Sequence, residues 1–449
     1  MIAAEKELYE VWSVALIAVA LVFVPYLAMF RRRRSHDHAR KLEASVLGVD
    51  RPVAQYPHVD PAVCIGCGAC ARACPEGDVL GVVGGVAVVI NGLRCVGHGH
   101  CATACPVGAI EVGLGDLKSR TDVPLLDDDL ETSVPGIYVA GELSGLALIR
   151  NAVEQGRRVV DRISAAGASA PRRGVPLDLA IVGAGPAGLA AALRASRLGL
   201  QCVVLEREAS LGGTLLHYPR RKLVLTRPVE IDPWGTLDRD EYAKEELLDV
   251  FADMVARFRI DVRFAHDVND VHRHDGFFEL RTPQASFAAR SVLLALGRRG
   301  APRRLEVPGE DLAKVTYRLQ DAASYERQRL LVVGGGDSAV EAAIGLAREG
   351  RNQVHLSYRR EKLLRVKRKN QEAFDKLVGR GRIQPLYGSE VERITADAVD
   401  LRLAGGEARR IENDYVFVLV GGVPPFDFLR RIGIHFGGSA APTAREGAG

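Results

Sequence analysis

Seven of the eight cysteines in this 449-residue chain lie between residues 64 and 105. The first run has the spacing Cys-x2-Cys-x2-Cys-x3-Cys-Pro and consists of Cys64, Cys67, Cys70 and Cys74. This spacing is typical of the ligands of a [4Fe-4S] cluster. Clustered thiols of this kind indicate metal ligation in a reducing compartment, because exposed thiolates are lost where the surroundings are oxidising.

The second run departs from that spacing at one position. It contains Cys95, Cys101 and Cys105, with His98 where another cysteine is expected. Three outcomes are open: His98 binds iron, a [3Fe-4S] cluster forms on three thiolates, or the site is empty. A histidine ligand would make the cluster easier to reduce, because a neutral donor replaces an anionic one. His100 is out of register for this role.

Residues 60–112 resemble a bacterial ferredoxin with two clusters, since both runs end in Cys-Pro and together span that small fold. In that family, three cysteines of one run share a cluster with the fourth cysteine of the other run. The resemblance implies one complete [4Fe-4S] site on Cys64, Cys67, Cys70 and Cys105. It implies a second site on Cys74, Cys95, Cys101 and, in doubt, His98. A zinc site is the alternative that the doubled spacing disfavours.

The first of two dinucleotide-binding fingerprints follows an apolar strand at 179–182 and precedes an alanine-rich helix at 189–198. Its glycines allow a tight turn and let a pyrophosphate approach the helix N-terminus, where the backbone N–H groups favour an anion. Glu206 ends the next strand, 202–205, where an acidic residue typically bonds a ribose hydroxyl. The loop residues are Gly183, Gly185, Pro186, Ala187 and Gly188.

The second fingerprint follows the strand 330–333 and consists of Gly334, Gly336, Asp337, Ser338 and Ala339 with their neighbours. Where an acid is expected 21 residues past the middle glycine, the chain has Ser357, followed closely by Arg359 and Arg360. Two guanidinium groups without a carboxylate favour the 2′-phosphate of NADPH over NADH. The alternative is a solvated basic face shared with the cations at 365–369.

Residues 121–436 resemble the thioredoxin-reductase-like flavoproteins. Both fingerprints carry the resemblance, as do the stretches 294–300 and 415–424. It implies that FAD is bound by the first loop, Glu206, Gly212, Gly213 and Thr214, and that NADPH is bound by the second loop with Arg359 and Arg360. In that family, hydride passes between stacked rings with little acid–base help. We therefore predict no catalytic side chain.

Two departures from that family bear on function. The family's redox dithiol would fall near residues 311–329, where this chain has no cysteine, so disulfide reduction by that route is excluded. The family's closing element appears upstream, at 132–142, followed by a helix-like stretch at 146–163. We interpret this order as a circular permutation that brings Gly141 and Glu142 to the flavin. The alternative is an ordinary strand and helix of a separate domain.

The stretch 11–30 has no charged residue and is long enough to span a bilayer. Arginines follow it at 31–34, which predicts a single-pass inner-membrane anchor with the N-terminus outside and the remaining domains in the cytoplasm. A signal peptide and a buried helix are the alternatives. The net charge of +4, with both signs abundant, gives no indication of nucleic-acid binding.

The predicted fold class is α/β. It comprises two Rossmann-like domains, a small α+β dicluster ferredoxin domain and one transmembrane helix. The predicted boundaries are 1–40 for the anchor, 41–120 for the ferredoxin domain, 121–300 for the FAD domain including the permuted 121–165, 301–412 for the NAD(P)H domain, 413–436 for the return into the FAD domain, and 437–449 for a tail.

Together these features predict a membrane-anchored oxidoreductase. Electrons would pass from NADPH through FAD to the clusters and on to a quinone or a redox protein, or in the reverse direction. The alternatives are a reductase of a soluble partner, an electron-relay subunit of a larger membrane complex without turnover of its own, and a redox sensor. A homodimer is compatible with each of them.

Overall fold

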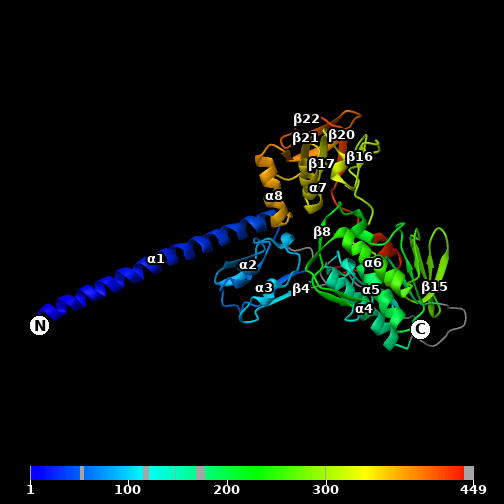
Figure 1. The fold of residues 1–449 in the computed structure, drawn as a ribbon, viewed down its shortest axis with the longest axis horizontal. Helices are drawn as coiled ribbons and strands as arrows, with labels where there is room; N and C mark the ends of the chain where they lie inside the picture. Colours follow the sequence, from blue (N-terminus) through cyan, green and yellow to red (C-terminus); the bar gives the residue numbers. More distant parts are fainter. Residues whose placement is uncertain are drawn as a thin grey trace, which may run out of the picture. The chain divides into compact units, whose positions relative to one another are not determined.

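The computed structural model describes residues 2–50, 55–114, 121–146, 148–167, 177–298 and 300–438. These residues fall into two compact units (Figure 1). We call Met1–Gly113 the cysteine-rich unit and Leu114–Gly449 the large unit. Most of the predicted tail at 437–449 lies outside the described residues.

The cysteine-rich unit begins with one long helix, α1 (Ile2–Leu47). The predicted transmembrane helix at 11–30 is wrong: in the described part of the chain, no helix combines the length and the apolar character that a bilayer crossing needs. The predicted inner-membrane localisation is wrong with it. The apolar stretch forms part of this 46-residue helix, whose other turns carry charged residues.

Two antiparallel strand pairs and two short helices complete the cysteine-rich unit. Strand β1 pairs with β4, and β2 pairs with β3. Helices α2 and α3 each follow a glycine in the left-handed conformation and each carry one cysteine, so the two cysteine runs fold alike. The elements are β1 (Tyr56–Val59), α2 (Ala69–Ala73), β2 (Leu80–Val83), β3 (Val86–Val89), η1 (Gly92–Arg94), α3 (His100–Thr103) and β4 (Ile110–Gly113).

The large unit has two lobes, and the first is built on a seven-stranded sheet. The strand order is β12-β7-β6-β15-β14-β13, and β5 also pairs with β15. The strands are β5 (Ile137–Val139), β6 (Leu177–Val182), β7 (Cys202–Leu205), β12 (Val262–Arg263), β13 (Asp270–His274), β14 (Phe277–Arg281) and β15 (Ser286–Leu294). Strands β5, β6, β7, β12 and β15 are parallel. Because parallel strands end at one edge, the loops after β5, β6 and β7 lie near one another there.

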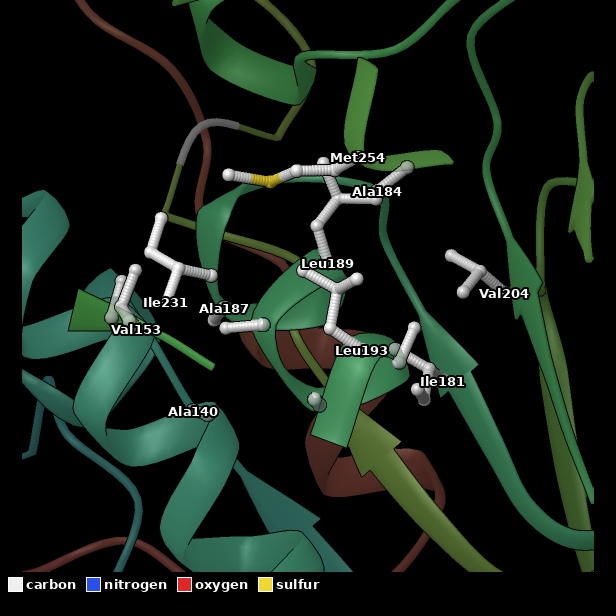
Figure 2. Close-up of a cluster of buried hydrophobic side chains, with 14 of the residues drawn as sticks. Ala140, Val153, Ile181, Ala184, Ala187, Leu189, Leu193, Val204, Ile231 and Met254 are labelled. Atoms are coloured by element: carbon white, nitrogen blue, oxygen red, sulfur yellow. The ribbon is translucent and has the colours of Figure 1, made fainter. Parts of the chain in front are cut away.

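Helix α5 (Pro186–Arg197) is the centre of the first lobe's core (Figure 2). Its Ala187, Leu189 and Leu193 pack among side chains of helix α4 (Ile149–Ala165), helix α6 (Lys244–Phe258) and the sheet. Gly156 of α4 lies so close to α5 that an added Cβ would approach the Ala187 carbonyl oxygen to 2.2 Å. Small residues therefore let α4, which precedes every strand of the sheet except β5 in the chain, lie directly against the fingerprint helix.

Short elements complete the first lobe. They are η3 (Glu142–Ser144), η4 (Gly213–His217), β8 (Leu223–Leu225), β9 (Val229–Ile231), β10 (Gly235–Leu237), β11 (Glu241–Ala243) and α9 (Phe426–Arg431). The chain returns to this lobe at its end, because Leu429, Ile434 and Phe436 share a core with Ile137 and Val139 of β5.

The second lobe has a parallel five-stranded sheet of order β16-β23-β17-β18-β19 and an antiparallel three-stranded sheet. The parallel strands are β16 (Val315–Thr316), β17 (Arg329–Val333), β18 (Gln353–Tyr358), β19 (Ile383–Tyr387) and β23 (Tyr415–Val418). The other elements are η5 (Ala322–Ser324), α7 (Asp337–Arg348), α8 (Arg368–Gly379), β20 (Ser389–Ile394), β21 (Ala398–Leu403) and β22 (Ala408–Glu412). Helix α7 is apolar where it covers this sheet, as Val340, Ile344 and Leu346 are buried.

Candidate functional site: two cysteine cavities and two nucleotide loops

The first cysteine cavity is lined by thiols from both runs. Cys64, Cys67 and Cys70 come from the first run and Cys105 from the end of the second. This is the set that the ferredoxin resemblance implies, so the donor chemistry fits a [4Fe-4S] cluster. The backbone N–H groups of Ala87 and Ala109 donate to the sulfurs of Cys64 and Cys105, at 3.4 and 3.3 Å. Such bonds stabilise the reduced form of a cluster.

The second cavity is lined by Cys74, Cys95, Cys101 and His98, with His100 also at its edge. The two imidazole rings are stacked with centroids 5.8 Å apart. Burial raises the pKa of the Cys95 thiol to about 11. The thiolate that a metal requires would therefore form only when the metal supplies the compensating charge.

Within the described residues, no group of three or more His, Cys, Asp or Glu side chains could hold one metal ion. A lone zinc needs all of its donors to converge on one point at about 2.0–2.3 Å. The thiols around an iron–sulfur cluster instead bind different irons, so they line a cavity and do not meet at a point.

The three fingerprint glycines of the first lobe are required for different reasons. A Cβ on Gly183 would lie 2.5 Å from the Ala295 carbonyl oxygen, and one on Gly188 would lie 1.9 Å from the Gly183 carbonyl oxygen. Gly185 differs, because no described atom lies within 4 Å of its Cβ position. This open space at the N-terminus of α5 fits the approach of a pyrophosphate.

Glu206 lies at the end of β7 beside this loop and is 3% exposed. Its carboxylate accepts the backbone N–H groups of Ala184 and Glu208, at 2.7 and 2.9 Å. Each oxygen keeps a further lone pair, so a ribose hydroxyl could still bond there. The acid therefore also holds the fingerprint loop against β7.

The remaining residues predicted to bind FAD gather around the same loop. A Cβ on Gly213 would lie 3.7 Å from the Cα of Gly185, and one on Gly297 would lie 3.6 Å from the Thr214 hydroxyl. The Gly212 N–H donates to the Ala184 carbonyl at 3.4 Å. The upstream segment reaches this loop as well, because a Cβ on Gly141 would lie 3.4 Å from the Cβ of Ala187. Glu142 is exposed at the start of η3.

Gln155 is a residue of this region that the sequence did not identify. It is buried on α4, and its side-chain carbonyl accepts the Gly141 N–H at 2.8 Å. Its amide nitrogen donates to the Ser144 hydroxyl at 2.9 Å. Gln155 therefore fixes the loop after β5 against α4, which packs on the fingerprint helix. The available signal was a glutamine among apolar positions of an amphipathic helix.

The second fingerprint repeats the arrangement of the first. A Cβ on Gly334 would lie 2.4 Å from the Leu419 carbonyl oxygen, whereas no described atom lies within 4 Å of the Cβ position of Gly336. Asp337 begins α7 and accepts the Lys367 N–H at 2.9 Å and the Asn370 amide at 2.7 Å. Its carboxylate thus holds α8 near α7. Ala339 is buried at the third fingerprint position.

A cavity of about 830 Å³ opens at this loop. Ser338, Arg359 and Arg360 line it, together with Ser357, which is fully buried and shares a 2.7 Å hydrogen bond with the Ser389 hydroxyl. Among the described residues that line the cavity, eight are Arg or Lys and four are Asp or Glu. This excess of four positive charges matches the charge of a dinucleotide with a 2′-phosphate, about −4 at neutral pH.

Two further pairs in this cavity were not identified from the sequence. Lys222 of the first lobe donates to Glu341 of α7 at 2.6 Å, and Asn370 donates to the same carboxylate at 3.0 Å. His217 lies 3.1 Å from Glu208. Burial lowers the pKa of His217, and the nearby Arg318 lowers it further. Residues 119 positions apart, such as Lys222 and Glu341, show no sequence signal of their pairing.

Comparison with known proteins matches both units. A family model described as pyridine nucleotide-disulphide oxidoreductase matches residues 180–446, more than half of the chain. The chain belongs to this family. A second model, described as a 4Fe-4S dicluster domain, matches residues 56–106. The predicted enzyme class, an FAD-dependent NAD(P)H oxidoreductase with an iron–sulfur domain, is thereby confirmed, as is the α/β fold of the large unit.

Similar proteins of this family include reductases with different partners. Bacilliredoxin reductase Bdr of Bacillus subtilis is 28% identical over 57% of this chain and 79% of its own length. The thioredoxin reductase of Mycolicibacterium smegmatis is 32% identical over 56% and 78%, and the ferredoxin–NADP reductase of Ignicoccus hospitalis is 28% identical over 58% and 82%. The structure of bacillithiol disulfide reductase Bdr from Staphylococcus aureus has a TM-score of 0.53, with 27% identity over 58% of this chain and 80% of that one.

Proposed function

We propose that this chain oxidises NADPH and passes the electrons through FAD to iron–sulfur centres, which exchange them with a redox protein or a quinone. The observation that carries the proposal is the first cysteine cavity, where four thiols from two separate runs surround one space. A member of this oxidoreductase family needs no such cavity for hydride transfer alone. The cavity therefore supports a path for single electrons through a cluster, in addition to the two-electron hydride transfer.

The nucleotide loops supply the other half of the proposal. Bound FAD would accept the electron pair of the nicotinamide and release the electrons singly. Gly185 leaves room for the FAD pyrophosphate, Glu206 fixes the loop and offers lone pairs to the ribose, and Gly336 leaves room for the second pyrophosphate. Arg359 and Arg360 border the cavity where the 2′-phosphate would lie, which favours NADPH over NADH.

The circular permutation is part of this proposal. Strand β5 pairs in parallel with β15 in the first lobe's sheet, and α4 packs on α5. Gly141, which precedes the FAD fingerprint in the sequence, lies beside the fingerprint helix. These contacts support the interpretation that residues 121–165 are the family's closing element placed ahead of the FAD domain. The second cysteine cavity would hold either a His98-ligated [4Fe-4S] cluster or a [3Fe-4S] cluster.

Anaerobic titration with NADPH tests the proposal. The full chain, reconstituted with FAD, iron and sulfide, is followed by optical and electron paramagnetic resonance spectra, with iron and flavin counted per chain. We expect flavin absorbance to bleach and cluster signals to appear in the same titration. A bleached flavin beside clusters that stay oxidised through prolonged incubation would contradict the one-electron path. Reduction of both without turnover on a quinone analogue would indicate a relay that depends on a partner.

A further inference from the structure

The last turns of α1 belong structurally to the cysteine-rich unit. The Asp37 carboxylate accepts the Val82 N–H at 2.9 Å, and the Lys41 ammonium donates to the Val89 carbonyl at 3.0 Å. Ala44 and Val49, at and just after the helix end, are buried. The C-terminal part of α1 therefore holds both strands of the β2–β3 pair.

Asp78 lies between two guanidinium groups. One carboxylate oxygen accepts from Arg40 of α1 at 2.7 Å, and the other accepts from Arg94 at 2.8 Å. Arg40 also donates to the Asp78 backbone carbonyl at 3.2 Å. The side chain of Arg94 is 11% exposed, so its charge is largely withdrawn from water. Removing the carboxylate would leave that buried charge without this counterion, which is costly.

These three residues connect the two loops that form the second cysteine cavity. Asp78 lies four residues after Cys74, and Arg94 immediately precedes Cys95. The short turn between Cys74 and Asp78 is fixed by two backbone bonds, from Gly77 to the Cys74 carbonyl at 3.1 Å and from Asp78 to the Glu76 carbonyl at 2.8 Å. A shift of Asp78 would therefore move Cys74 relative to Cys95.

We propose that Asp78 is a positioning residue for the second cluster, and that Arg40 makes the end of α1 part of its support. The Asp78 carboxylate sets the separation of Cys74 and Cys95 through Arg94, and Arg40 ties both loops to α1. None of Arg40, Asp78 and Arg94 lines the first cavity, so we expect its cluster to depend less on this ion-pair network. The inference rests on the proposed function, since it requires that the second cavity hold a cluster.

The test replaces Asp78 by Asn in the full chain, reconstituted anaerobically. Iron and acid-labile sulfide are counted, and both cluster signals are recorded by electron paramagnetic resonance. We expect the second cluster's signal to be lost or altered, with iron falling toward about half of the wild-type content if the cluster is lost. The first cluster's signal should be unchanged. Asp78→Glu, which keeps the charge, should restore the second signal at least in part.

Two further variants make the result specific. Asp60→Asn removes one negative charge from the same unit, but beside the first cysteine run. It should leave the signal of the second cluster as in the wild type. Arg40→Met removes only the hydrogen bonds between α1 and Asp78. It should shift the signal or the midpoint potential of the second cluster without loss of the first cluster. Equal loss of both clusters in Asp78→Asn would show a general folding defect and overturn the inference.

Other outcomes are equally decisive. Unchanged spectra and iron content in Asp78→Asn would show that the carboxylate does not position the cluster ligands. Wild-type protein with iron for only one cluster would overturn the inference as well, and the failure would lie in the proposed second site because it appears without any substitution. An altered second signal in Asp78→Asn with an unaltered one in Arg40→Met would remove α1 from the proposed support.

Discussion

At the residue scale, the middle glycine of each nucleotide loop differs from the first glycine in the atoms that surround its Cβ position. Gly183 and Gly334 are enclosed by carbonyl oxygens of their own lobe, whereas the Cβ positions of Gly185 and Gly336 face open space. The first pair is therefore required for folding. The second pair is required only if a ligand approaches, and this difference can be measured.

Gly336→Ala should leave the free energy of unfolding nearly unchanged and weaken NADP⁺ binding at least tenfold. The backbone at Gly336 suits any residue, with φ −99°, but a methyl group would occupy the space of the pyrophosphate. Calorimetric titration with NADP⁺ measures the binding. Gly334→Ala should instead destabilise the fold, because its Cβ would clash with Leu419. Gly379→Ala, also in open space but away from the cavity, should leave NADP⁺ binding unchanged.

The double change of Arg359 and Arg360 to Gln should raise KM for NADPH far more than KM for NADH. Each charge-assisted hydrogen bond to the 2′-phosphate contributes about 1.5–3 kcal/mol, and NADH has no such group. Steady-state kinetics with both nucleotides measures the ratio. Arg380→Gln, outside the cavity lining, is the control. An equal effect on both nucleotides would assign the two arginines to a solvated basic face.

Lys222→Met should weaken NADP⁺ binding about three- to tenfold, or about 0.7–1.4 kcal/mol. Without Lys222, the Glu341 carboxylate in the cavity is left without its cation and repels the phosphates of the ligand. The double variant Lys222→Met with Glu341→Gln should recover most of the affinity, since it removes the repulsion. No recovery in the double variant would mean that Lys222 contacts the nucleotide itself.

Much of the candidate site follows from local sequence. Cysteine spacing and glycine loops are local patterns, so Cys64, Gly185 and Gly336 could be selected without a structure. Gln155 and Lys222 could not, because their partners come from other elements and their types are common on any helix or loop. The roles of the predicted site residues stay predictions until the ligands are measured.

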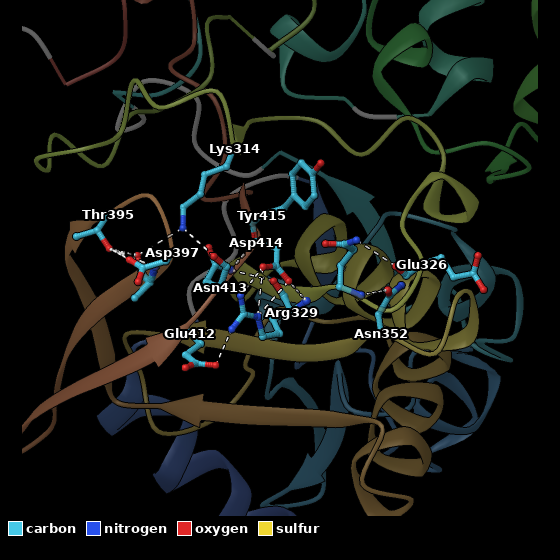
Figure 3. Close-up of polar contacts among 12 residues, drawn as sticks. Lys314, Glu326, Arg329, Asn352, Thr395, Asp397, Glu412, Asn413, Asp414 and Tyr415 are labelled. Atoms are coloured by element: carbon cyan, nitrogen blue, oxygen red, sulfur yellow. Dashed lines mark hydrogen bonds and ion pairs between the residues drawn. The ribbon is translucent and has the colours of Figure 1, made fainter.

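At the element scale, the start of β17 is tied to the start of β23 at the sheet edge opposite the nucleotide loop (Figure 3). Arg329 donates to both carboxylate oxygens of Asp414 and to Glu412, and its own N–H also donates to Asp414 at 2.7 Å. The Lys314 ammonium donates to the Asn413 carbonyl at 3.0 Å. This network fixes the register of the two central strands.

Asp414→Asn should lower the free energy of unfolding by about 1–2 kcal/mol at pH 7. The Arg329 hydrogen bonds hold the pKa of Asp414 below its usual 3.8. A carboxylate with a lowered pKa stabilises the fold fully above that usual value, and the contribution is lost as the pH falls through the lowered pKa. Denaturant unfolding of both proteins should therefore differ at pH 7, and the difference should shrink only as the pH falls below 3.8 and through the lowered pKa. A constant difference would assign the effect to something other than ionisation.

Helices and strands could be predicted from the sequence where a short hydrophobic pattern ends at a clear boundary residue. The predicted strand 202–205 matches β7. The fingerprint helix begins at Pro186, three residues before the predicted start, because proline suits the first turn. The apolar stretch 11–30 gave the wrong prediction of a membrane span, because no described helix is long and apolar enough to cross a bilayer.

At the scale of the whole molecule, the division into units predicts what can be separated. Residues 114–449 expressed alone should fold, retain FAD and be reduced by NADPH, because they form one compact unit. Residues 177–449, which lack β5 and α4, should lose FAD, since the Gly141 loop that Gln155 holds lies against Ala187 of the fingerprint. Flavin per chain and the NADPH-dependent bleaching rate are the measurements. Full flavin retention in the shorter piece would refute the permutation.

The position of β5 in the first lobe's sheet also bears on how the chain is made. Residue 137 of β5 pairs with residue 292 of β15. A ribosome adding about 5–20 residues per second delivers that partner roughly 8–30 s after β5 has emerged. During this interval the nascent strand has an unsatisfied edge, so the first lobe closes late in translation, and its newly made N-terminal part needs protection from aggregation until then.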